Sequence, residues 1–279
     1  MNILITTHGA QRPSNAGQNQ QPISSSKSLL RYPGGKSRAV DQLLPFFAQQ
    51  PGILCSPFFG GGSLELALAA RGWRVHGYDA FRPLVDFWQC ALTEPLLLAD
   101  AVERHHPLSR QQFYLLKEEQ LELQIERAAA YYAINRASFS GSTLSGGMSP
   151  GHPRFTESCI ERLRRFTSPN VWVEQSDFQE SIARHPTATI YGDPPYPDAT
   201  GLYGRDGDLH DGFDHLALAE TLRSRENWIL SYSDCPQVRQ MYDGYEIVPA
   251  AWKYGMSSDK DSREILILSR DLATTHKRE

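Results

Sequence analysis

The chain has 279 residues, of which 40% are hydrophobic, and a formal net charge of −4. This length suffices for one large domain or two moderate ones with a sizeable core. The acidic balance excludes a surface that is basic throughout, so any binding of phosphate groups would need a local basic patch.

Residues 1–28 are rich in Gln, Asn, Ser, Pro and Gly. We expect a disordered tail, because this segment buries too little apolar surface to offset the entropy of ordering. Structure is predicted to start at Leu29, where the turn Tyr32-Pro-Gly-Gly-Lys36 leads into a helical pattern over 40–47. Glycines followed by a lysine at a helix start suit a carboxylate or phosphate, and a plain loop is the alternative.

A glycine turn, Gly60-Gly-Gly62, follows an expected strand over 53–56 and precedes a helix. This order is typical of the first βα turn of a nucleotide-binding sheet. The turn matches neither the Gly-x-Gly-x-x-Gly fingerprint nor a Walker sequence, which argues against a pyrophosphate cofactor. The next strand, 73–79, ends at Asp79. An acid at this point suits a ribose diol, and the alternative is an N-cap for the segment that begins at Phe81.

The α/β alternation stops over residues 85–167, where helical patterns dominate 94–104 and 110–135. We interpret this segment as an inserted, mainly helical domain, which leaves 29–84 and 168–279 to form the sheet domain.

The helical segment contains a stretch of glycines and small polar residues from Asn135 to Gly147, which continues to Phe155. With Arg136 and Arg154, it favours a loop or hairpin that enters a nucleic-acid groove. A solvated surface loop is an equally good interpretation of these residues alone. A basic helix end follows at Arg162, Arg164 and Arg165.

Five further strands are expected after the helical segment, which makes seven in all. The first of them, 171–178, ends in Asp177 and Phe178, and this acid is placed to meet an adenine amino group. A glycine- and aspartate-rich stretch, 201–212, is predicted to be a flap beside the site. We expect no metal there, because His210 and Asp211 stand where a calcium loop needs other residues. The other expected strands are 187–191, 228–232, 245–248 and 264–268, with helices over 213–223 and 236–242.

The sequence Asp193-Pro-Pro-Tyr196 ends the strand over 187–191. Two prolines cannot continue a central strand, so Asp193 and Tyr196 are presented at its carboxyl end, where ligands bind in open α/β sheets. An exocyclic amine of a nucleobase is a poor nucleophile, and the Asp193 carboxylate and Pro194 carbonyl are two acceptors for its N–H bonds. Tyr196 suits stacking on a base. An ordinary proline turn is the alternative.

These motifs, in this order, resemble the Dam-like (D12, class alpha) N6-adenine DNA methyltransferase family over about 29–269. The motifs that carry the resemblance are Tyr32-Pro-Gly-Gly-Lys36, Pro57-Phe-Phe-Gly-Gly-Gly-Ser63, Asn135-Arg-Ala-Ser-Phe-Ser-Gly141, Asp193-Pro-Pro-Tyr196 and Arg263-Glu-Ile-Leu-Ile267. The resemblance implies an α/β fold: a Rossmann-like class I methyltransferase sheet of seven mostly parallel strands, with an inserted, mainly helical DNA-recognition domain.

The resemblance also implies the cofactor, the partners and the site residues. The cofactor is S-adenosylmethionine, and double-stranded DNA is the partner of a monomeric, cytoplasmic enzyme; a cognate restriction endonuclease is left open. Catalysis is implied for Asp193, Pro194 and Tyr196, cofactor binding for Tyr32, Lys36, Phe58, Gly60, Asp79, Asp177 and Asp193, and DNA binding for Asn135, Arg136, Ser140 and Arg154. No metal is expected. From Ser140 onward the chain lacks the arginine of close relatives, so the resemblance does not define a target sequence.

Two further hypotheses remain open at this point. One is the same chemistry on cytosine N4, on adenine in RNA, or on a protein amide. The other is a DNA-binding regulator without catalysis, against which the intact Asp-Pro-Pro-Tyr sequence and glycine turn argue. No apolar run in the sequence reaches the length of a membrane span, and the four scattered cysteines are typical of reduced thiols in a cytosolic protein.

Overall fold

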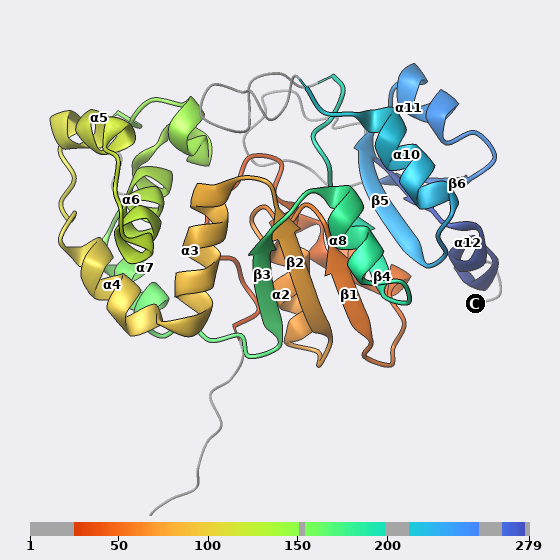
Figure 1. The fold of residues 1–279 in the computed structure, drawn as a ribbon, viewed down its shortest axis with the longest axis horizontal. Helices are drawn as coiled ribbons and strands as arrows, with labels where there is room; N and C mark the ends of the chain where they lie inside the picture. The colour runs from red at the N-terminus through yellow and green to blue at the C-terminus, as the bar shows by residue number, and fades with distance from the viewer. Residues whose placement is uncertain (1–24, 151–153, 199–211, 251–263, 277–279) are drawn as a thin grey trace, which may run out of the picture.

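A computed structural model describes residues 25–150, 154–198, 212–250 and 264–276 of the chain. Within these ranges, one seven-stranded sheet forms the centre of the molecule (Figure 1). Its strands are β1 (Ile53–Ser56), β2 (Arg74–Asp79), β3 (Val171–Gln175), β4 (Thr189–Gly192), β5 (Trp228–Ser233), β6 (Glu246–Ala250) and β7 (Glu264–Leu268). The sequence-based prediction of seven strands, two before the helical segment and five after it, is confirmed.

The strand order is β3-β2-β1-β4-β5-β7-β6. The pairs from β3 to β5 are all parallel, whereas β7 runs antiparallel to both β5 and β6. The sheet is therefore mostly parallel and Rossmann-like, as the resemblance implied. The chain order reverses between β1 and β4, and ligands bind at such a switch point, beyond the carboxyl ends of the strands.

Buried side chains of the strands alternate between two hydrophobic clusters, one on each face of the sheet. In β5, Ile229 belongs to one cluster, while Trp228 and Leu230 belong to the other. In β7, Leu266 and Ile267 divide in the same way. This period of two follows from the pleat of a strand, and burial on both faces explains why β5 and β7, which are buried along their whole length, are mostly apolar.

Helices cover both faces (Figure 1). The first cluster includes residues from α1 (Val40–Leu43), α2 (Ser63–Ala69) and α3 (Arg82–Thr93), and α12 (Arg270–His276) packs against it. The second cluster includes residues from α8 (Phe178–Arg184), α10 (His215–Arg223) and α11 (Pro236–Met241). The helix expected over 40–47 is short, because α1 is flanked by 3-10 turns at Lys36–Arg38 and Leu44–Phe46.

Four more helices lie between β2 and β3 in the sequence and stand together at the side of the sheet, beyond α3 (Figure 1). They are α4 (Pro95–Glu103), α5 (Arg110–Glu118), α6 (Gln124–Ala137) and α7 (Glu157–Arg164). Their buried residues belong to the same hydrophobic cluster as α3 and one face of the sheet, which anchors this helical segment to the sheet.

The helical pattern expected over 110–135 forms two helices, α5 and α6, joined by a short non-helical link. The chain leaves the helical conformation at Glu119, next to Glu118, and negative charge at a helix carboxyl end opposes the macrodipole. The Arg127 guanidinium donates hydrogen bonds to the carbonyls of Leu121 and Glu122, so these two backbone groups in the link between the helices have partners.

The end of the predicted tail contacts the folded chain. The backbone N–H of Ser25 donates to the Thr167 carbonyl at 2.7 Å, and Arg162 donates to the carbonyls of Lys27 and Ser28. Arg164 is paired with Asp100 and Glu103, while Arg165 is paired with Glu161. The basic helix end that the sequence suggested is therefore largely occupied by contacts within the chain.

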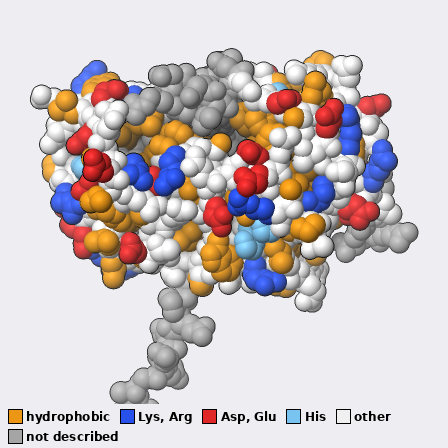
Figure 2. Space-filling view, in the orientation of Figure 1, with side chains coloured by type: hydrophobic (Ala, Val, Ile, Leu, Met, Phe, Trp, Pro, Cys, Tyr) orange, Lys and Arg blue, Asp and Glu red, His pale blue; other side chains and the backbone are white. Residues whose placement is uncertain are grey.

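Acidic and basic side chains are interspersed on the face shown in Figure 2. On α8, Arg184 pairs with both Glu174 and Glu180, at 3.1 and 2.5 Å. Exposed pairs of this kind contribute little to stability, so they mainly neutralise the surface locally. Among the helices of the described ranges, none is long and apolar enough to cross a bilayer.

Candidate active site

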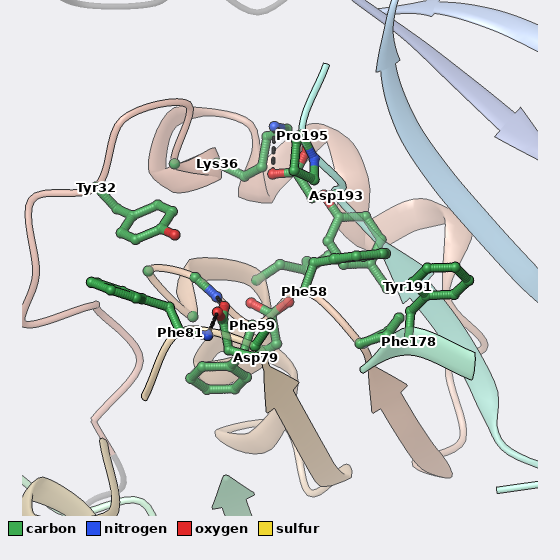
Figure 3. Close-up of a pocket in the computed structure, with 18 of the residues that line it drawn as sticks. Tyr32, Lys36, Phe58, Phe59, Asp79, Phe81, Phe178, Tyr191, Asp193 and Pro195 are labelled. Atoms are coloured by element: carbon green, nitrogen blue, oxygen red, sulfur yellow. Dashed lines mark hydrogen bonds and ion pairs between the residues drawn. The ribbon is translucent and has the colours of Figure 1, made fainter. Parts of the chain in front are cut away.

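A cavity of about 410 Å³ opens at the carboxyl ends of β1, β2 and β4, beside the point where the strand order reverses. Its size is that of a small-molecule site. It is lined by Tyr32, Gly35, Lys36, residues 57–65, residues 79–81, residues 176–178, Tyr191, Asp193, Pro195 and residues 212–214. Figure 3 shows Lys36, Asp193 and Pro195 at one end of this cavity and Asp79 at the other, with aromatic rings between.

The glycine turn forms one wall because it allows close packing of its neighbours. Gly60 and Gly62 have φ values of 48° and 63°, which disfavour residues with a side chain. A Cβ atom at Gly60 would lie 2.9 Å from the Tyr32 ring. The Gly60 carbonyl accepts a hydrogen bond from Trp88 Nε1 at 2.9 Å, which fixes the turn on α3. Tyr32 and Gly60, both predicted as cofactor-binding residues, therefore lie together.

Asp79 is held at the end of β2 by two backbone groups. Its Oδ2 accepts from the N–H of Gly60 and its Oδ1 from the N–H of Phe81, each at 3.0 Å. Loss of solvent around the carboxyl group raises its pKa to about 6. Helix α3 has Phe81 as its N-cap, so the capping role considered for Asp79 does not hold. The two bonds aim the carboxylate at the cavity beside the glycine turn.

Asp193 lies directly after β4 and forms a buried ion pair with Lys36. Lys36 Nζ is 2.7 Å from both carboxylate oxygens of Asp193, and the Lys36 side chain is 4% exposed. Burial raises the pKa of Asp193, the Lys36 ammonium opposes this shift, and the nearby Glu264 carboxylate adds to it. The two predicted residues, 157 positions apart, thus meet in one charged cluster.

The rest of the Asp-Pro-Pro-Tyr sequence surrounds this pair. The Tyr196 hydroxyl is 3.0 Å from Asp193 Oδ1 and 3.0 Å from Lys36 Nζ. Pro195 lines the cavity, Pro194 is buried, and Tyr196 is half-buried with its ring 5.9 Å from that of Tyr232. The structure therefore brings together Asp193, Tyr196 and Lys36, whereas Pro194 and Tyr196 lie outside the lining of the cavity itself.

An aromatic cluster closes the side of the cavity next to α8. The rings of Phe58, Phe178 and Phe213 lie 5.5 to 6.0 Å apart in pairs. Asp177 borders the cavity, and its Oδ1 caps α8 by accepting from the N–H of Glu180 at 2.8 Å. Of these four residues, sequence reasoning missed Phe178 and Phe213, since a phenylalanine beside a predicted strand or flap is not distinctive. The predicted flap, 201–212, lies outside the described residues except for Gly212, which lines the cavity.

Glu65 is a site residue that the sequence did not reveal. It lies on α2, is 3% exposed, and accepts a hydrogen bond from Ser56 Oγ at 2.8 Å while lining the cavity. Burial raises its pKa to about 7. Only its place among the apolar residues that follow the glycine turn could have indicated that this acid is buried.

The burial of Glu65 predicts a pH-dependent stability. Its pKa is raised from 4.5 to about 7 in the folded chain, so the folded state binds more protons than the unfolded state between these values. Stability therefore falls as the pH rises through this window, by up to about 3 kcal/mol for the full shift. We expect Glu65→Gln, which keeps an acceptor for Ser56, to be the more stable protein at pH 8 and equal to wild type near pH 4. Urea unfolding at several pH values measures this.

Glu220→Gln is the matched control, because Glu220 is an exposed acid on α10. Its unfolding free energy should follow that of wild type at every pH. Curves for Glu65→Gln and wild type that stay parallel from pH 4 to 8 would contradict the assignment of Glu65 as a buried, protonated group.

The residues predicted to bind DNA take different positions. Asn135 is fully buried: its Oδ1 accepts from the Arg31 N–H at 3.0 Å, and its Nδ2 donates to the Arg31 carbonyl at 2.7 Å. A side chain enclosed in this way has no surface to offer a base or phosphate. The structure therefore gives Asn135 a structural role, in contrast to the predicted contact with DNA. It ties α6 to the segment that carries Tyr32.

The other three predicted DNA-binding residues lie at the surface near Arg31. Arg136 donates from Nε and Nη2 to the Arg154 carbonyl, at 3.1 and 3.0 Å, and Arg154 is exposed. Both arginines lower the pKa of Arg31, after the larger effect of burial. Ser140 is half-buried with a φ of 57°, next to the exposed Phe139, in a loop closed by the bridge between Ser138 and Met148. These residues form a basic edge beside a hairpin-like loop.

Comparison with known families gives one match. The description "D12 class N6 adenine-specific DNA methyltransferase" matches residues 32–256, which begins at the Tyr-Pro-Gly-Gly-Lys turn and includes the glycine turn, Asp79 and the Asp-Pro-Pro-Tyr sequence. No curated protein matches the chain. Because the match covers most of the chain and includes every wall of the cavity, the chain belongs to the D12 class N6 adenine-specific DNA methyltransferase family.

Proposed function

We propose that this protein transfers a methyl group from S-adenosylmethionine to N6 of an adenine in double-stranded DNA, after the adenine has been extruded from the helix. The observation that carries the proposal is the cluster of Lys36, Asp193 and Tyr196 at one end of a cavity whose other end holds Asp79. Family membership supports methyl transfer to adenine, and the donor and the extrusion are our inference.

The residues present fit S-adenosylmethionine. A cavity of about 410 Å³ with aromatic walls suits an adenosyl group, and the Asp79 carboxylate at the end of β2 suits a ribose diol. Phe58, Phe178 and Asp177 border the place for the adenine ring, while Tyr32 and Lys36 border the place for the methionine part. When bound, the cofactor supplies an electrophilic methyl group on a positively charged sulfur. Asp193 puts a carboxylate beside it, which favours a cation there.

The protein's own contribution to the reaction is position and charge. The ionised Asp193 carboxylate accepts one N–H of the adenine amine and the Pro194 carbonyl accepts the other, so the nitrogen lone pair is turned toward the methyl group. The bound cofactor would supply the methyl group, and the Asp193 carboxylate, which holds an N–H of the amine, would take the proton that the nitrogen loses. Tyr196 stacks on the extruded base. Alignment of this kind accounts for much of the barrier reduction in group transfer.

Extrusion of the base costs a few kcal/mol, which contacts to the DNA must offset. We assign these contacts to the basic edge formed by Arg31, Arg136 and Arg154 and to the adjoining loop from Ser138 to Met148. Phosphate contacts of this type position a duplex but carry no base sequence directly. In this proposal the enzyme acts as a monomer, and a paired restriction endonuclease stays a prediction.

Product analysis tests the proposal. Plasmid DNA is incubated with the protein and methyl-labelled S-adenosylmethionine, digested to nucleosides and examined by mass spectrometry. We expect N6-methyladenine in duplex DNA. Label on cytosine N4, on RNA or on protein would overturn the proposed acceptor. If no label transfers and calorimetry detects no cofactor binding, the catalytic function itself is wrong. Single-base sequencing of the product would then give the target sequence.

A further inference from the structure

Glu264 is the first residue of β7 and lies in the catalytic cluster. Because β7 runs antiparallel to β5, its beginning lies beside the end of β5, where Glu264 pairs with Ser233. This places a carboxylate at the same edge of the sheet as Asp193. Glu264 is 4% exposed, and its Oε1 is 2.8 Å from the Tyr196 hydroxyl and 3.7 Å from Lys36 Nζ.

The Tyr196 hydroxyl has two carboxylate neighbours but only one proton to donate. Its oxygen is 2.8 Å from Glu264 Oε1 and 3.0 Å from Asp193 Oδ1. Lys36 approaches the same oxygen at 3.0 Å as a donor, so the Tyr196 oxygen acts there as an acceptor. Of these two carboxylates, Glu264 lies at the shorter distance from the hydroxyl, which favours it as the acceptor of the proton.

The direction of this proton decides how much acceptor capacity Asp193 retains. A carboxylate has about four acceptor positions, two on each oxygen. Lys36 has three protons and four acceptors within reach, the Gly34 carbonyl, the Tyr196 oxygen and both oxygens of Asp193, so one of its protons is shared between Oδ1 and Oδ2. A proton from Tyr196 would fill the second position on Oδ1 and leave only Oδ2 for the N–H of a substrate amine.

We propose that Glu264 is a positioning residue that accepts the Tyr196 hydroxyl proton and thereby keeps Oδ1 of Asp193, and not only Oδ2, open to the adenine amine. The inference rests on the proposed function only in naming that amine. Glu264 touches neither cofactor nor base in this account and acts through Tyr196. The contact also holds the far end of the Tyr196 ring, on which the extruded base stacks.

Kinetics of three variants tests the proposal. Glu264→Ala lets the Tyr196 proton turn to Asp193, and we expect kcat to fall about tenfold, the rate equivalent of one hydrogen bond, with KM for DNA changed much less. Glu264→Gln keeps an oxygen acceptor and should stay within about threefold of wild type. The double variant Tyr196→Phe/Glu264→Ala has no proton left to misdirect, so it should be faster than Glu264→Ala alone.

A spectroscopic measurement gives an answer without any methyl transfer. In protein labelled with ¹³C at the aspartate carboxyl carbon, the resonance absent from Asp193→Asn identifies Asp193. We expect Glu264→Ala to shift this resonance and the added Tyr196→Phe change to reverse the shift. Asp86→Asn removes a buried acid of α3 that is paired with Arg82 of the same helix and with Arg127 of α6, and it should lower the melting temperature without moving the Asp193 resonance.

Two results would overturn the inference. One is an Asp193 resonance that does not respond to Glu264→Ala, and the other is a double variant no faster than Glu264→Ala. If the wild-type protein transferred no methyl group at all, the proposed function would fail, while the carboxyl resonances would still decide where the Tyr196 proton lies.

Discussion

Asp193→Asn is expected to lower kcat for methyl transfer by about a thousandfold or more, while affinity for duplex DNA stays within about threefold of wild type. The asparagine side chain keeps the shape of Asp193 but replaces one acceptor oxygen with a donor. That nitrogen would face Lys36, whose Nζ lies 2.7 Å from both oxygens of the native carboxylate. The side chain would then turn its remaining oxygen to Lys36 and present N–H groups to an amine that itself needs an acceptor.

We expect a large fall in kcat because Asp193→Asn removes the negative charge of the carboxylate as well as one acceptor oxygen. Removal of one stabilising donor from an oxyanion hole costs 10² to 10³ in rate, and here the only carboxylate in the Asp-Pro-Pro-Tyr sequence is lost. The measurement is single-turnover transfer of labelled methyl groups to plasmid DNA, combined with fluorescence anisotropy of a labelled duplex.

Asp198→Asn is the matched control, since Asp198 is an exposed acid five positions further along the chain. It should retain wild-type transfer. The unfolding midpoint of Asp193→Asn must also be recorded, because loss of one partner of a buried ion pair costs about 3–5 kcal/mol. A folded Asp193→Asn protein with wild-type kcat would eliminate the proposed mechanism.

Gly141→Ala is expected to destabilise the protein by at least about 3 kcal/mol and to weaken cofactor and DNA binding together. Gly141 has a φ of 77°, and a Cβ atom there would overlap the carbonyl oxygen of Arg31 and lie 2.6 Å from its carbonyl carbon. Because the obstructing atoms are backbone, neither a rotamer change nor a small side-chain shift can relieve the overlap. The chain would have to move Arg31 and its neighbour Tyr32.

Gly244→Ala separates the two causes of this effect. Gly244 has a φ of 81°, close to that of Gly141, but a Cβ atom there meets nothing within 4 Å. Its substitution should therefore show only the cost of the left-handed backbone, about 1 kcal/mol. Urea unfolding gives the two free energies, and calorimetry gives cofactor binding. If the two variants lost the same free energy of unfolding, the overlap with Arg31 would contribute nothing to the destabilisation.

The strands could be predicted well from the sequence because their signal is local. Each is a short apolar, β-branched run bounded by turn residues, and burial on both faces of a mostly parallel sheet gives such runs. Asp193 and Lys36 could be predicted as site residues because both belong to motifs whose order along the chain is meaningful. Their contact, in contrast, depends on the sheet that brings positions 157 apart together.

What could not be predicted depends on distant neighbours. The sequence pattern remains helical across the link between α5 and α6, so the link could not be predicted from it. Only the structure shows that Arg127 donates hydrogen bonds to the backbone carbonyls of 121 and 122 within this link. Asn135 was placed on the DNA side because it belongs to a recognition motif, yet its amide is used by Arg31, 104 positions away. Glu65 and Glu264 were overlooked as site residues, because an acid within an apolar run shows at most that it is buried and not which side chains it meets.

The two hydrogen bonds between Asn135 and the Arg31 peptide have a mechanical consequence. They hold both the N–H and the carbonyl of Arg31, the residue before Tyr32, whose ring lies against the glycine turn. The wall of the cavity and the last turn of α6 are thereby joined through one residue. By thermodynamic reciprocity, if a ligand in the cavity changes DNA affinity through this link, DNA must change the affinity for that ligand by the same factor.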